Sequence, residues 1–120
     1  MLLFKSWIEA LRSDKYKQIY GEMENENGVC AGGILPKLNK GISCGMINLW
    51  DSGLHFSKDF LLNEKESKIK FDKFRNMSRE IATWNDKDKL TFPEIAHRIE
   101  AALLSGAIEE IELLDEPKEI

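Results

Sequence analysis

Two cysteines and two histidines are the residues in this chain best suited to metal binding or nucleophilic catalysis. They are Cys30, Cys44, His55 and His97. Structural zinc sites usually take their ligands from close pairs separated by about two to four residues, and no two of these four lie that close. A catalytic thiol would need a base and an orienting group beside it, and the neighbouring sequence supplies neither. We therefore expect no metal, no cofactor and no catalytic residue, and interpret the thiols as small buried groups.

The stretch DKDKLTFPEI, residues 86–95, is similar to part of an EF-hand calcium loop. In such a loop alternate positions supply oxygen ligands, a glycine allows the turn and a glutamate occupies the last position. With Asp86 first, Leu90 falls on a ligand position, Thr91 replaces the glycine and His97 replaces the glutamate. Calcium binding is therefore not expected, and the acidic residues suit a turn between two helices.

The stretch CAGGIL, residues 30–35, is the most glycine-rich part of the chain. A phosphate-binding loop would also need a lysine followed by serine or threonine, and a dinucleotide-binding loop would need a third glycine. Neither is present, so this segment is not expected to bind a nucleotide.

The overall charge restricts the class of partner. The 120 residues include 21 acidic and 17 basic side chains, giving a net charge of −4. A mildly acidic surface repels phosphate backbones and anionic lipid heads, so we expect neither a nucleic acid nor a membrane partner. No apolar run approaches the roughly 18–20 residues of a membrane span, and the first residues lack the basic start of a secretory signal. We expect a cytoplasmic protein with reduced thiols.

Amphipathic helices are predicted near both ends of the chain. Apolar residues recur at helical spacing over residues 3–12. The second helix begins at Thr91, which is followed three residues later by Glu94, the signature of a capping box. Pro93 suits a first helical turn, and Gly106 suits a left-handed stop.

The segments between these helices predict a mixed α+β fold. Tyr16, Gln18 and Tyr20 alternate with Lys17 and Ile19 before an Asn-Gly turn, which predicts a hairpin over residues 16–30. Alternation also predicts a strand over residues 66–74. The remaining predicted elements are a helical turn at 34–38, a strand from 42 to a turn at 51–53, a short helix at 57–63, a helix at 76–84 and a strand or helix over 107–117.

These elements predict one small domain over residues 1–114, with an N-terminal helix, a β-hairpin or antiparallel sheet, and a C-terminal helix. Residues 115–120 are acidic and follow the last apolar positions. We expect them to form a frayed tail, as terminal residues often do.

Three stretches, WIEALRSDKYKQIYG, GVCAGGIL and WNDKDKLTFPEIAHRIE, together resemble a group of small bacteriophage and mobile-element proteins. That group has a Trp-x-x-Ala-Leu-Arg-Ser motif near its start and an Asn-Asp motif followed by Ser/Thr-Phe-x-Glu-Ile-Ala near its end. The group also tends to have a cysteine-rich run. In this chain, Ala31 and Pro36 stand where that run has two of its cysteines. The resemblance implies a phage or prophage origin and no established activity. The matching positions are Trp7, Ala10, Leu11, Arg12, Ser13, Tyr16, Gln18, Gly21, Cys30, Gly33, Ile34, Leu35, Asn85, Asp86, Thr91, Phe92, Glu94, Ile95 and Ala96.

The first functional hypothesis is a non-enzymatic binding module that acts on a host protein, for example as an inhibitor in counter-defence. This hypothesis rests on the lack of a catalytic set of residues and on the phage-like motifs. An acidic surface would also complement a basic site on a host protein. An exposed tryptophan is a good anchor for a partner. The candidate contacts are Trp50, Glu109, Glu110, Glu112 and Asp115.

The alternative hypothesis is a protein that binds or sequesters a small ligand such as a nucleotide. Arg12 would hold phosphate and Tyr16 would stack on the base, with Gln18, Asn85 and Asp86 completing the pocket. A structural interpretation of the same residues, which we favour, pairs Arg12 with Asp86 to tie the first helix to the turn before the last one. A minor virion component is the third possibility.

Overall fold

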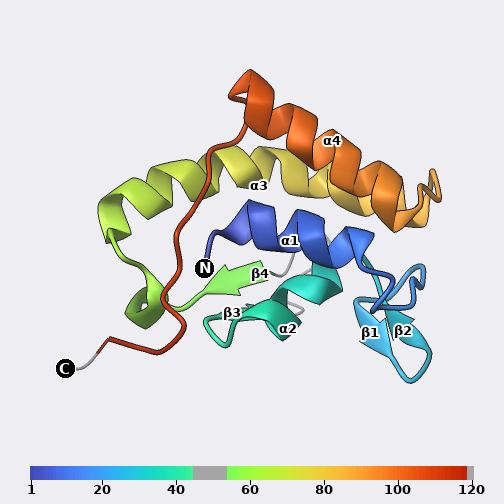
Figure 1. Cartoon of the computed structure of the whole chain (residues 1–120), viewed down its shortest axis with the longest axis horizontal. Coiled ribbons are helices and arrows are strands. Elements are labelled where there is room, and N and C mark those ends of the chain that lie inside the picture. Colours follow the sequence, from blue (N-terminus) through green and yellow to red (C-terminus); the bar gives the residue numbers. More distant parts are fainter. Residues whose placement is uncertain (45–53, 119–120) are drawn as a thin grey trace.

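The first and last helices form where the sequence predicts them. The computed structural model describes residues 1–44 and 54–118, and places helix α1 at Leu3–Arg12 and helix α4 at Phe92–Ser105 (Figure 1). The two helices pack against each other. The apolar stripe of α1 faces this contact and the interior, with Leu3, Phe4, Trp7, Ile8 and Leu11 all buried.

The predicted capping box at the start of α4 is confirmed. The Thr91 hydroxyl accepts a hydrogen bond from the amide of Glu94 at 3.3 Å, and the Glu94 carboxylate accepts one from the amide of Thr91 at 3.1 Å. Pro93 lies in the first turn, and Gly106 ends the helix with a φ of 82°. Local sequence therefore determines both ends of α4.

The predicted strand over residues 66–74 is wrong, because this segment belongs to the long helix α3, Glu64–Asp86. The helix also contains the segment predicted as a separate helix at 76–84. Phe74, Ser78, Ile81 and Asn85 are buried at helical spacing along one face. Ile69, which the alternation assigned to the buried side of a strand, is 57% exposed.

The predicted hairpin exists, but its arms are shorter than expected. Strands β1, Glu24–Asn25, and β2, Gly28–Val29, pair antiparallel around a turn at Glu26 and Asn27, so the glycine of the predicted Asn-Gly turn lies in β2. Residues 17–19, predicted as part of the first arm, instead run parallel to Val29. The Val29 amide donates to the Lys17 carbonyl at 2.9 Å, and the Ile19 amide donates to the Val29 carbonyl at 3.0 Å.

A second small antiparallel sheet pairs β3, Ile42–Cys44, with β4, Leu54–Phe56. β3 begins the strand predicted from residue 42, and the rest of that prediction, with its turn at 51–53, lies outside the described residues. The predicted helical turn at 34–38 is confirmed as the 3-10 helix η1, Gly32–Ile34, continued by α2, Leu35–Leu38. The predicted short helix at 57–63 is reduced to the 3-10 helix η2, Lys58–Phe60.

The last segment, residues 107–118, is an extended strap and has no helix. It descends from α4 past the N-terminus (Figure 1), and buries Ile108, Ile111 and Leu113. Isolated bridges join it to Leu2 and to Leu61. The backbone of the predicted tail is hydrogen-bonded as far as Lys118, whose amide donates to the carbonyl of Asp59 at 2.7 Å.

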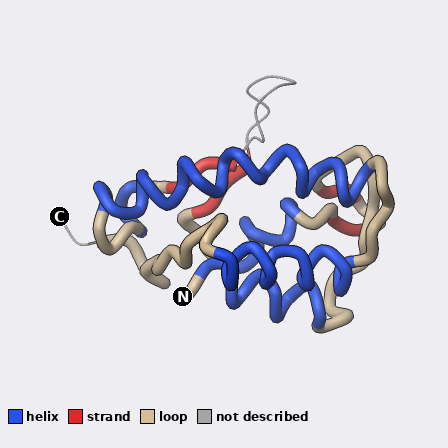
Figure 2. The backbone as a smooth tube through the Cα atoms, turned by 90° about the horizontal axis from the view of Figure 1, so that it is seen from above, coloured by secondary structure: helices blue, strands red, loops and turns tan. Residues whose placement is uncertain are grey.

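The α+β fold class is confirmed, with the helices forming most of the walls of the core. Figure 2 shows α3 along one long side of the molecule and α1 with α4 along the other. Phe4 and Trp7 of α1 meet Phe74 of α3 edge-on, with ring centroids 5.3 and 5.9 Å apart. In the described part of the chain, no helix combines the length and apolar character needed to span a bilayer.

Candidate functional site

Asn85 is the hub of a buried polar network near the C-terminal end of α3. Its side chain is 1% exposed. The Oδ1 atom accepts hydrogen bonds from Gln18 Nε2 at 2.9 Å and from the amide of Ala31 at 3.1 Å. The Nδ2 atom donates to the carbonyl of Ile19 at 2.9 Å and to Asp86 Oδ1 at 2.8 Å. All the hydrogen-bonding capacity of this amide is therefore used within the protein.

Asp86 continues this network to the surface. Its Oδ1 atom accepts a second hydrogen bond, from the amide of Gly21 at 2.9 Å. Gln18 also donates to the carbonyl of Leu90 at 2.8 Å. The sequence thus identified three residues that the structure brings together, Gln18, Asn85 and Asp86, but their contacts bind the 18–21 segment to α3.

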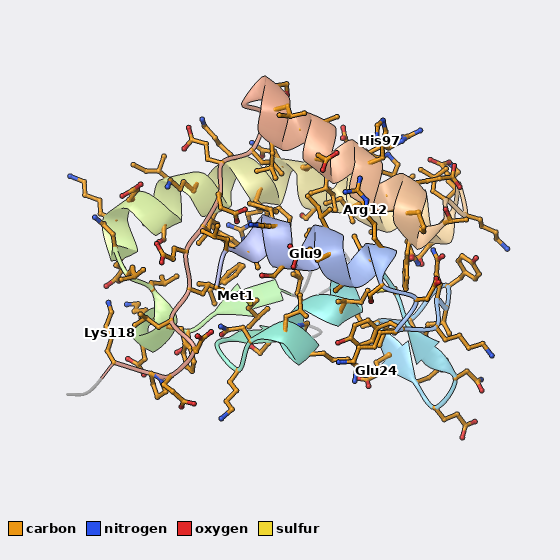
Figure 3. All side chains as sticks on the ribbon, viewed as in Figure 1. Met1, Glu9, Arg12, Glu24, His97 and Lys118 are labelled. Atoms are coloured by element: carbon orange, nitrogen blue, oxygen red, sulfur yellow. The ribbon has the colours of Figure 1, made fainter. Side chains whose placement is uncertain are left out.

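The predicted pairing of Arg12 with Asp86 is wrong. The Arg12 guanidinium instead donates to both carboxylate oxygens of Glu100 on α4, at 3.1 and 3.4 Å. Figure 3 shows Arg12 at the C-terminal end of α1, pointing toward α4. The pKa of Glu100 is lowered because its charged form accepts these hydrogen bonds. Tyr16, the remaining member of the predicted ligand set, is half-buried and packs against the core.

Of the four candidate metal ligands, the structure describes the side chains of Cys30 and His97, and those of Cys44 and His55 lie outside the described part. Cys30 is buried, and its Sγ atom lies 3.5 Å from the Sδ atom of Met23. Burial raises the pKa of this thiol, which keeps it protonated and unreactive at neutral pH. His97 is exposed on α4. The described residues contain no group of three or more His, Cys, Asp and Glu side chains that could hold an ion.

The acidic residues of the C-terminal strap that were predicted to contact a partner differ from one another in their own contacts. Glu110 accepts hydrogen bonds from the amides of Phe4 at 2.6 Å and Lys5 at 3.0 Å, so it caps α1 from a distant part of the chain. Leu2, at the N-cap position itself, has no side chain that could do this. Glu109 pairs with Lys73 of α3 at 3.1 Å.

Glu112 and Asp115 are exposed on the strap. Asp115 is close to the N-terminal nitrogen, at 3.9 Å, and its side chain remains largely in solvent. Trp50, the predicted anchor, lies outside the described residues. Trp84 on α3 is half-buried and lies under the guanidinium of Arg98, whose carbon is 5.0 Å from the ring centre.

A hollow beside the strap brings acidic residues together with exposed apolar side chains. This acidic groove has a volume of about 280 Å³ and lies between the start of α3 and residues 110–112. Leu2 and Leu62, which face it, are 41% and 51% exposed. The described residues that line it are Leu2, Leu62, Asn63, Glu66, Ser67, Lys70, Glu110, Ile111 and Glu112.

The charged residues of the acidic groove are three carboxylates and one ammonium. The ammonium belongs to Lys70, which donates to Glu66 at 2.7 Å, and this contact raises the pKa of the lysine. Glu110 is committed to the amides of α1. Glu112 is therefore the groove carboxylate with neither an ion pair nor a side-chain hydrogen bond in the described structure.

The acidic groove and the Asn85 network lie at opposite ends of α3, so they are separate candidate sites. No protein family, curated protein or solved structure matches the chain.

Leu2 and Leu62 were missed by sequence reasoning, because their neighbours Leu3 and Leu61 are equally apolar and are buried. Which leucine of each pair faces solvent depends on how the strap packs.

Proposed function

We propose that this protein is a non-enzymatic binding module, and that it docks a basic, amphipathic segment of a partner protein in the acidic groove. The observation that carries the proposal is the exposure of Leu2 and Leu62 inside a hollow that Glu66, Glu110 and Glu112 surround. Apolar side chains that stay in solvent within a concave, charged surface are typical of contact sites.

The charge of the groove determines the chemistry of the partner. Carboxylates outnumber the single ammonium, and that ammonium is already bound to Glu66. A segment carrying lysine or arginine would place a cation beside Glu112, while an adjacent apolar side chain would cover Leu62. Such complementarity steers association and selects against acidic partners.

The resemblance to small bacteriophage and mobile-element proteins supports a host protein as the partner. We include counter-defence inhibition in the proposal, because binding alone can block a host factor. This part is supported by the sequence motifs and by analogy, whereas the groove supports only the class of partner. No reaction is proposed, since Glu66 and Lys70 bind each other and Glu110 binds the amides of α1.

The test uses immobilised protein and a lysate of a candidate bacterial host. Leu62→Ser removes the apolar contact and Glu112→Lys reverses the charge; both positions are exposed, so the fold should persist. The matched controls are Leu104→Ser on α4, where the side chain is 84% exposed, and Glu26→Lys in the hairpin turn. We expect a retained protein that both groove variants lose and both controls keep.

Cross-linking of the retained complex would then locate the contact on the partner. A segment rich in lysine or arginine, linked near Glu112 and released by added salt, is the expected result. Retention that is equal for wild type and both groove variants would contradict the proposal, as would an acidic partner segment.

A further inference from the structure

A second hollow lies beside the Asn85 network, between the 21–32 segment and α3. It has a volume of about 140 Å³. Its lining includes the buried residues Trp7, Phe74 and Ile81 and the more accessible residues Met23, Gly32 and Ala82. An apolar cavity of about 150 Å³ can hold a benzene ring, so this hollow is large enough for a small ring or a short alkyl chain.

The charged residues at the mouth of this hollow are both acidic. Glu22 and Asp86 are the charged members of the described lining, and both are exposed. Asp86 is held in a defined position, because its Oδ1 atom accepts from the Gly21 amide at 2.9 Å and from Asn85 Nδ2 at 2.8 Å. The Oδ2 atom takes part in neither of these hydrogen bonds.

The inner wall contributes no compensating charge. The Cys30 thiol lines the hollow, and its pKa is raised by burial and, to a smaller extent, by the charge of Asp86. The thiol therefore remains neutral and adds no charge that would offset Asp86.

We propose that this hollow binds a small organic cation, with its ammonium group beside Asp86 and its apolar body against Met23 and Ala82. The site is separate from the acidic groove and does not depend on the function proposed for that groove. A phosphate-bearing ligand such as a nucleotide does not suit it, because Glu22 and Asp86 would repel the phosphate. Arg12, the residue predicted to hold phosphate, is bound to Glu100 instead.

The test compares three probes of one shape: benzylamine, the neutral benzyl alcohol and the anionic benzoate. Amide and indole signals are followed by two-dimensional NMR of the full chain. The indole N–H of Trp7 is a specific reporter, because it is hydrogen-bonded to the carbonyl of Ala31 at 2.9 Å. We expect benzylamine to shift this signal and those of Gly21 and Gly32 saturably, with an affinity at least about tenfold above benzyl alcohol.

Two variants and one control test the site directly. Asp86→Asn keeps the oxygen that accepts from Gly21 and removes the charge, and we expect it to weaken benzylamine binding at least tenfold. Asp88→Asn makes the same charge change at a nearby exposed residue outside the hollow and should leave binding unchanged. Ala82→Phe fills the hollow from its exposed rim and should abolish binding while the unfolding midpoint is retained.

Three results would overturn the proposal. They are equal binding of benzylamine and benzyl alcohol, equal loss in the Asp86 and Asp88 variants, and no saturable shift with any of the three probes. The groove variant Leu62→Ser should bind benzylamine normally, so the two proposals can fail independently.

Discussion

The indole nitrogen of Trp7 donates a hydrogen bond to the carbonyl oxygen of Ala31 at 2.9 Å. The backbone amide of Ala31 donates in turn to Asn85 Oδ1 at 3.1 Å. Ala31 is fully buried, so water cannot replace either partner. The backbone of Ala31 therefore joins α1 to the end of α3, and both proposed sites depend on helices that this residue holds together.

Asn85→Ala should strongly destabilise the protein. The substitution leaves the amide of Ala31 and the carbonyl of Ile19 without partners in the interior. Each unsatisfied buried group costs about 1–3 kcal/mol, so the free energy of unfolding should fall by about 3 kcal/mol. Urea denaturation measures the change. Asn76→Ala, at an exposed position of the same helix, should change it by less than about 0.5 kcal/mol.

Gly33→Ala and Gly32→Ala should differ although the positions are adjacent. A Cβ atom at Gly33 would collide with the carbonyl oxygen of Met23, whereas one at Gly32 would make an ordinary contact with Met23 Cε at 3.5 Å. We expect the Gly33 variant to lose about 1–3 kcal/mol of stability. The Gly32 variant should unfold close to wild type. Equal thermal midpoints for the two variants would contradict this explanation.

Glu110→Gln should weaken α1. The neutral side chain can accept with one oxygen only, and the negative charge at the helix N-terminus is lost. The expected loss is about 1 kcal/mol in the free energy of unfolding. Glu109→Gln is the matched control next to it, since in the described structure its carboxylate pairs with Lys73 at the surface. Similar effects of the two substitutions would show that Glu110 does not act as a cap.

Thr91→Ala should raise the pKa of Glu94. In the folded protein this pKa is lowered, first by the hydrogen bond from the Thr91 amide and then by the one from its hydroxyl. Because the folded pKa is below the unfolded value, the stabilisation is present above the unfolded pKa and is lost as pH falls through the folded pKa. The substitution removes the hydroxyl contact and, at neutral pH, about 1 kcal/mol of capping energy.

An NMR titration of the side-chain carboxyl groups measures this change. Glu100 on the same helix is the internal control, because its pKa is lowered by Arg12 and not by Thr91. Its titration should be the same in wild type and in the Thr91 variant. If Glu94 also titrates identically in both proteins, the Thr91 hydroxyl does not contact the Glu94 carboxylate in solution.

The error over residues 66–74 has a physical cause. Ile69 and Phe71 alternate with lysines, which is typical of a strand with one wet face. The same residues also fit a helix, in which Phe71 is half-buried and Ile69 is exposed. Asn63 then caps this helix by accepting from the amide of Glu66 at 3.0 Å. A nine-residue window cannot decide between the two periods, whereas the stripe through Phe74, Ile81 and Asn85 can.

The candidate sites were likewise predictable only where a local pattern was sufficient. Sequence alone identified Gln18, Asn85 and Asp86 as one cluster, but it paired Asp86 with the wrong helix and assigned Arg12 to the same site. In the sequence, Glu110 and Glu112 are indistinguishable acidic residues. In the structure, Glu110 caps α1 and Glu112 faces the groove. These roles depend on contacts between residues more than 60 positions apart, which no local pattern encodes.

The sequence by itself determined the two terminal helices, the capping box at Thr91 and the α+β class, because helix caps and apolar stripes act over one or two turns. Only the tertiary structure decided the rest. The strap over residues 107–118 has no period of its own, and it becomes ordered by burying Ile108, Ile111 and Leu113 against the helices. That packing leaves Leu2 and Leu62 in solvent and so creates the acidic groove.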